Sequence, residues 1–177
     1  MDNPISLTGV ETLCPVSTDQ IQNTLLRKCL EHWEDLRADK KAPDYNEIDL
    51  LTFPLSLIPA CSVVEISPVD QTMRYRFWGS SLTRFTQMDM TGEAIEDMPI
   101  NIDGNAVYNQ FDLIKNQIKP GLFIMQLIAS NGHEATETVI RLPLSKDNTN
   151  VDSILSFSDM GDNPFLYPEN KNYTVIG

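Results

Sequence analysis

The last third of the chain contains three extended runs in close succession, and this pattern constrains the fold more than any other feature. The runs span residues 122–129, 134–144 and 151–159. Asn131-Gly132 lies between the first two and is a strong signal for a two-residue β-hairpin turn. A polar turn separates the second run from the third. These residues are therefore predicted to form a three-stranded antiparallel meander.

Two more extended runs lie in the middle of the chain, at 61–67 and 71–78. The turn between them begins with a proline, and the pair is predicted to form a second β-hairpin. In the second run Met73, Tyr75 and Phe77 alternate with two arginines, so one face of this strand is predicted to be buried. The sequence thus predicts five strands.

The clearest helix is predicted over residues 18–37, where apolar side chains recur every three or four positions. Leu26, Leu30 and Trp33 belong to this wide apolar stripe. Because so much apolar surface is costly to leave in water, the stripe must either cover the chain's own sheet or pair with another subunit. Both arrangements fit the pattern.

Shorter helical elements are predicted around the first hairpin. Residues 43–60 contain three prolines, which favour short helical turns over a strand. Gly79 ends the second extended run, and the spacing of Leu82 and Phe85 predicts a helix of one or two turns after it. A longer helix is predicted over 104–118, before the meander begins.

The chain has 177 residues, which suits one domain with extensions. Residues 1–17 show no sustained periodicity and are predicted to be a loosely structured leader. An N-terminal amphipathic helix and its end occupy 18–42, the main domain 43–160, and an irregular tail 161–177. The predicted fold class is α+β, with a five-stranded antiparallel sheet and helices packed on one face, preceded by the N-terminal helix.

Charge and composition exclude several classes of partner. The net charge of −12, from 25 acidic and 13 basic residues, repels phosphate backbones, so no nucleic-acid partner is expected. No apolar run approaches the roughly 20 residues that span a bilayer, and a secretory signal is not evident, which favours a cytoplasmic protein without a membrane segment. Cys14, Cys29 and Cys61 fit neither a disulfide framework nor a metal site, and buried free thiols are expected.

The order of elements is similar to the PAS fold, and four local segments resemble a bacterial group of small stand-alone PAS-like proteins. In chain order these are LEHWEDLR, NEIDLLTFPLSLIPA, MRYRFWGSSLTRF followed by DMTG, and IRLPLSKD. The resemblance covers about residues 30–160. It implies a sensory or interaction module in which the sheet and the helices opposite it enclose a small cavity.

The resemblance also bears on cofactors. Flavin-binding light sensors of this fold use a cysteine on the helix after the second strand, and the corresponding segment SSLTRFTQ has none. Haem-binding members take a histidine from the long helix, and 104–118 contains none. Neither flavin nor haem is therefore expected. The two histidines, His32 and His133, have no evident nucleophile or metal partner, so no catalytic or metal site is expected and the chain is predicted not to be an enzyme.

An unidentified small apolar ligand could still occupy the core. The candidate lining residues share strand or helix spacing and a large apolar side chain. They are Tyr75, Phe77, Leu82, Phe85, Val107 and Phe111. The same side chains would also fill a core that holds no ligand, which is their commoner role.

Two kinds of function fit these observations. The first is a stand-alone PAS-like sensory or regulatory module that acts through contact with an unidentified protein partner, and that forms a homodimer through Leu26, Leu30 and Trp33. The second is a small-molecule carrier or an enzyme with a dispersed site. A purely structural adaptor, acting through the sheet or the tail 161–177, is a third and simpler interpretation.

Overall fold

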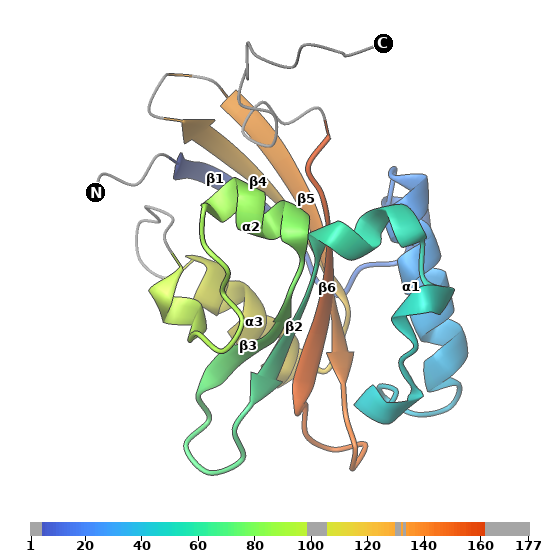
Figure 1. Ribbon diagram of the computed structural model, residues 1–177. Helices are drawn as coiled ribbons and strands as arrows, with labels where there is room; N and C mark the ends of the chain where they lie inside the picture. The colour runs from blue at the N-terminus through green and yellow to red at the C-terminus, as the bar shows by residue number, and fades with distance from the viewer. Residues whose placement is uncertain (1–4, 99–105, 130–131, 133, 162–177) are drawn as a thin grey trace, which may run out of the picture.

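The structure, a computed structural model, describes residues 5–98, 106–129, 132 and 134–161. Six strands form one antiparallel sheet in the order β1-β4-β5-β6-β2-β3, and helices cover both of its faces (Figure 1). The strands are β1 Ile5–Leu13, β2 Cys61–Ile66, β3 Met73–Trp78, β4 Gly121–Ala129, β5 Glu134–Leu144 and β6 Ser153–Asp159. The predicted α+β class and the two predicted hairpin regions are confirmed, with one strand more than expected.

Three α-helices and several short 3-10 turns complete the fold. The helices are α1 Thr24–Arg37, α2 Ser80–Thr86 and α3 Ala106–Gln117, and the turns are η1 Thr18–Gln20, η2 Tyr45–Glu47, η3 Leu50–Thr52, η4 Leu55–Ala60 and η5 Ile95–Asp97. The short turns η2 to η4 occupy the proline-rich segment, as predicted. Within the described ranges, no helix is long and apolar enough to cross a membrane.

The first strand corrects the prediction of a loosely structured leader over 1–17. β1 pairs with β4 from Leu13 opposite Leu122 to Ile5 opposite Ala129. Its periodicity is weak in the sequence because it is an edge strand: Val10, for example, is 39% exposed. Pairing with a neighbour, rather than burial of a continuous apolar face, makes this segment a strand.

Side-chain alternation divides the interior into two cores, one on each face of the sheet. On β5, Val139 belongs to the core beneath α2 and α3, whereas Ile140 and Leu142 belong to the core beneath α1. We call these the cavity face and the α1 face. Helices were expected on one face of the sheet in addition to the N-terminal helix, and in the structure α1 with η2 to η4 covers the other face.

The apolar stripe of α1 lies against the chain's own sheet. Leu26, Leu30 and Trp33 are each at most 1% exposed. The indole Nε1 of Trp33 donates a hydrogen bond to the carbonyl oxygen of Pro143 on β5, at 2.9 Å. The prediction that these three residues form a dimer interface is therefore wrong, because the sheet of the same chain already buries them.

A β-bulge in β3 changes which side chains reach each face. Val64 pairs with Tyr75 but Val63 pairs with Phe77, so Arg76 is left without a partner in the register. Tyr75 consequently packs in the core of the cavity face, and Phe77 packs on the α1 face. The prediction that Phe77 lines the cavity is wrong, because strict alternation fails at the bulge, and Trp78 faces the cavity instead.

Candidate functional site

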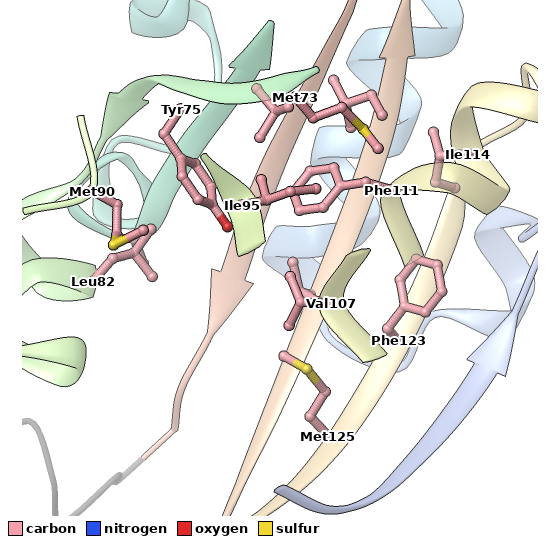
Figure 2. Packing of buried hydrophobic residues seen from close by; sticks show 14 of the residues in the cluster. Met73, Tyr75, Leu82, Met90, Ile95, Val107, Phe111, Ile114, Phe123 and Met125 are labelled. Carbon is pink, nitrogen blue, oxygen red and sulfur yellow. The ribbon is translucent and has the colours of Figure 1, made fainter. Parts of the chain in front are cut away.

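A small cavity lies on the cavity face, between the sheet and the helices α2 and α3, and has a volume of about 40 Å³. Its apolar wall is formed by Leu7, Tyr75, Trp78, Leu82, Phe85, Met98, Val107, Met125 and Leu127. Its polar lining is formed by Ser62, Thr86, Glu137, Arg141 and Ser158. Figure 2 shows Tyr75, Leu82 and Val107 converging from β3, α2 and α3 on the region above the sheet.

Most of the residues predicted to line a cavity lie in this core. Tyr75, Leu82, Phe85 and Val107 contribute directly to the cavity wall. Phe111 lies one helical turn beyond Val107 on α3, is fully buried, and packs over the guanidinium of Arg141 rather than against the cavity itself. Phe77 lies outside the site.

Arg141 is the central polar residue of the site and is only 5% exposed. Its Nε and Nη2 atoms donate to the side-chain oxygen of Gln110 on α3, at 3.0 and 2.8 Å, and its Nη1 donates to Ser156 Oγ at 3.0 Å. The guanidinium carbon lies 4.0 Å from the centre of the Phe111 ring. These contacts come from α3 and β6, so two elements hold the cation on β5 in place.

The charge of Arg141 has no carboxylate partner within ion-pair distance among the described residues. Burial lowers the pKa of Arg141 to about 10, while Tyr75 and Glu137 favour its charged form. The guanidinium therefore stays protonated at neutral pH. A buried cation whose hydrogen-bond partners are neutral is costly, because the partners orient the charge without neutralising it.

Glu137 lies on the same face of β5, with its Cα roughly 13 Å from that of Arg141 along the strand. It is 6% exposed, and one carboxylate oxygen accepts a hydrogen bond from Ser158 Oγ at 2.6 Å. Burial raises the pKa of Glu137, and the Ser158 hydrogen bond and the positive charge of Arg141 oppose this effect in part. The cavity thus has a cationic group and an acidic group at separate positions.

Trp78 adds an unused hydrogen-bond donor to the wall. Its indole Nε1 is buried and has no hydrogen-bond partner among the described residues. The indole packs edge-on against Tyr75, with ring centres 4.6 Å apart. Buried indole N–H groups usually have an acceptor, and Trp78 lines the cavity, so a ligand acceptor that reached this atom would be stabilised.

The polar residues that line the site or hold Arg141 were not predicted from the sequence: Ser62, Thr86, Gln110, Glu137, Arg141, Ser156 and Ser158. A signal was present, because single polar residues stand between large apolar ones, as in Ile140-Arg141-Leu142 and Leu155-Ser156-Phe157. Such alternation normally indicates a solvent-exposed face. Here both faces of β5 and β6 are covered, so the polar side chains are buried.

The cysteines and histidines lie elsewhere. Cys29 and Cys61 belong to the core of the α1 face, and burial raises the pKa of the Cys29 thiol to about 12. His32 contacts Thr52 Oγ1 at 2.7 Å, and His133 lies outside the described residues. In the part of the chain that the structure describes, no group of three or more His, Cys, Asp or Glu side chains could hold a metal ion.

A family model described as "PAS domain" matches residues 21–157. No curated protein matches the chain. Three of the similar solved structures are an RNA-binding Light-Oxygen-Voltage receptor, the light state of the Aureochrome1 LOV domain, and a fungal LOV domain photoreceptor. Their sequence identities are 13%, 9% and 17%, and their TM-scores are 0.44, 0.43 and 0.40.

The matched portions differ in extent. The matches cover 86%, 63% and 64% of this chain, and 39%, 88% and 81% of the respective structures. The chain thus spans about two fifths of the length of the RNA-binding receptor.

Proposed function

Because the chain belongs to the PAS domain family, we propose that it acts as a sensory or regulatory module that binds a small ligand and signals through contact with another protein. The observation that supports this proposal is the small cavity lined by Arg141. Arg141 is buried there, and no carboxylate among the described residues forms an ion pair with it. A fold alone does not specify a function, so the site carries the argument. A ligand that neutralises this charge would be bound more tightly than a neutral one.

The elements around the cavity suggest how occupancy could be transmitted. Gln110 on α3 holds Arg141 on β5, and Leu82 and Phe85 on α2 close the opposite wall. A ligand in the cavity would contact the sheet and both helices at once. It would stabilise one arrangement of α2 and α3 over others, because only differential contacts can shift such an equilibrium. A protein partner would then bind the outer surface of these helices in one arrangement more tightly than in the other.

The proposed ligand is neither flavin nor haem. The cavity holds on the order of three water molecules, far less than a flavin ring requires. No cysteine or histidine lines it among the described residues.

We also propose that the module is not an enzyme and resides in the cytoplasm of a bacterium, where three free thiols suit a reducing environment. Nucleic acid is disfavoured by the net charge of −12, and a homodimer would need a surface other than the stripe of α1.

One observation favours an enzyme as the second candidate. Ser158 Oγ donates to the carboxylate of Glu137 at 2.6 Å, which is the relation of a nucleophile to a base. The pair lacks a histidine, and the small cavity leaves little room for a substrate. Hydrolysis of a small ester by the wild-type protein, lost in Ser158→Ala, would favour this alternative over a sensory module.

The sensory proposal is tested by closing the cavity. Val107→Phe should fill the space that Val107 now borders, and Val10→Phe, on the exposed edge strand β1, is the matched control. The measurement is the melting temperature and the hydrogen exchange of the full chain, with and without a desalted extract of small cellular molecules. We expect the extract to raise the melting temperature and slow exchange in α3 and β5 of the wild type and of Val10→Phe, but not of Val107→Phe. An extract that leaves the wild type unchanged, together with native mass spectra showing no bound mass, would contradict the proposal.

A further inference from the structure

The donors left over at the cavity define the chemistry of the ligand. We propose, on the basis of the sensory function above, that the cavity selects a short-chain monocarboxylate whose carboxylate group binds the unused N–H groups of Arg141. The proposal rests on the hydrogen bonds of Arg141, the unpartnered indole of Trp78, the apolar wall and the position of Glu137.

The guanidinium of Arg141 has N–H groups that no described residue accepts a hydrogen bond from. Of its five N–H groups, one on Nε, one on Nη1 and one on Nη2 are used by Gln110 and Ser156. One N–H on each terminal nitrogen therefore has no described partner. Two N–H groups on one guanidinium match the two oxygens of a carboxylate, which is the geometry that makes arginine the preferred ligand for this group.

The surroundings of Arg141 prepare it for an anion. Gln110 and Ser156 fix the plane of the guanidinium, and Phe111 packs against its face at 4.0 Å. The side chain is 5% exposed, so an incoming carboxylate would meet a cation that is already oriented and largely desolvated. Preorganisation of this kind lowers the entropy lost on binding and strengthens the ion pair.

The rest of the cavity sets the size and polarity of the ligand. Leu82, Val107 and Leu127 offer an apolar wall for a hydrocarbon body, and the Nε1 of Trp78 is a second donor for an oxygen acceptor. A volume of about 40 Å³ suits acetate or propionate more than a long chain. Glu137 lies in the same cavity, and burial raises its pKa, so this part of the cavity disfavours a charged carboxylate; the second carboxylate of a dicarboxylate would be disfavoured there for the same reason.

The test compares propionate with propionamide, which has nearly the same shape but no charge. Binding of each to the full chain is measured by isothermal titration calorimetry, alongside succinate and propylamine. We expect propionate to bind at least about tenfold more tightly than propionamide, and succinate and propylamine to bind more weakly than propionate. Arg141→Gln should abolish the preference for propionate, Arg141→Lys should retain part of it, and Arg76→Gln, an exposed arginine of β3, should leave it unchanged.

The outcomes separate this inference from the function on which it rests. Equal binding of propionate and propionamide, or tighter binding of propylamine, would overturn the carboxylate assignment and leave a ligand-binding module in place. Failure of all four compounds to bind, while native mass spectra of the purified protein show a bound small molecule, would also overturn the carboxylate assignment and leave a ligand-binding module in place. Failure of all four with no bound mass would overturn both. The comparison of propionate with propionamide uses the wild type, so it stays decisive even if Arg141→Gln does not fold.

Discussion

At the scale of single residues, the site combines two ionisable side chains that a chain seldom buries. Arg141 and Glu137 are each at most 6% exposed, and each is held by neutral hydrogen-bond partners instead of by the other. Burying these groups without a direct ion pair lowers the free energy of unfolding, because each loses its hydration without gaining a partner of opposite charge. The polar part of the cavity is therefore a feature that the fold supports at the expense of stability.

This cost gives a pH dependence for Glu137. Because burial raises its pKa, the folded chain binds this proton more tightly than the unfolded chain, and its contribution to stability is full below the ordinary pKa of 4.5 and is lost as the pH rises through the folded value. Glu137→Gln removes the titration and keeps a side chain that can bond to Ser158. Its free energy of unfolding, relative to the wild type, should therefore increase as the pH is raised above about 4.5, by no more than about 1.4 kcal/mol per pH unit.

The measurement is urea unfolding of both proteins at several pH values from acid to neutral. Glu134→Gln, at the exposed start of the same strand, is the control for losing one carboxylate from the surface. A difference between Glu137→Gln and the wild type that stays constant across the range, or that shrinks as the pH rises, would contradict the assignment of a raised pKa to Glu137.

At the scale of elements, the junction of β3 and α2 depends on the absence of a side chain at Gly79. Its backbone N–H donates to the carbonyl oxygen of Cys61 at 2.9 Å, and a Cβ at this position would lie 2.2 Å from the carbonyl oxygen of Pro59. The neighbouring atoms are backbone and cannot move aside cheaply. β3, the start of α2 and the end of η4 therefore have to meet at a glycine.

We expect Gly79→Ala to lower the free energy of unfolding by about 2 kcal/mol or more, because the backbone must shift at a close-packed crossing. Gly9→Ala is the matched control, since a Cβ there would make only ordinary contact, at 3.8 Å, with Gln126. Chemical denaturation of the two variants provides the comparison. Equal stability of the two would show that the crossing at Gly79 can relax.

The elements also show how far the sequence alone predicts this fold. Helical and strand periodicity located α1, α3 and the strands from β2 to β6, because each places a regular apolar face in a core. The bulge at Arg76 could not be predicted, since no glycine or proline marks it, and it moved Phe77 out of the site. The buried polar residues of β5 and β6 could not be recognised either, because polar and apolar residues alternate in the same way when the polar face is exposed to solvent and when it lines a buried cavity.

At the scale of the whole molecule, α1 and the strands form one structural unit. The stripe of α1 shares its core with β5 and β6, so the helix is not an appendage and its apolar stripe is not free to pair with another subunit. The family model, which matches from residue 21, also includes this helix. Under the proposed function, ligand-dependent changes would involve the helices of the cavity face, and α1 would act as a fixed support on the opposite side of the sheet.

This arrangement predicts that a substitution in the core beneath α1 lowers the free energy of unfolding of the whole molecule. Leu30 is 1% exposed whereas Leu25, on the same helix, is 36% exposed. Leu30→Ala should lower the free energy of unfolding by about 2–5 kcal/mol, through lost burial and a cavity in the core, and Leu25→Ala should lower it by less than about 1 kcal/mol. Unfolding followed by tryptophan fluorescence and by circular dichroism should give one coincident transition in each protein, because Trp33 and Trp78 report on opposite faces of a single cooperative unit. If α1 were instead a dimerisation arm, Leu30→Ala would change the sedimentation coefficient and leave the unfolding of the sheet intact.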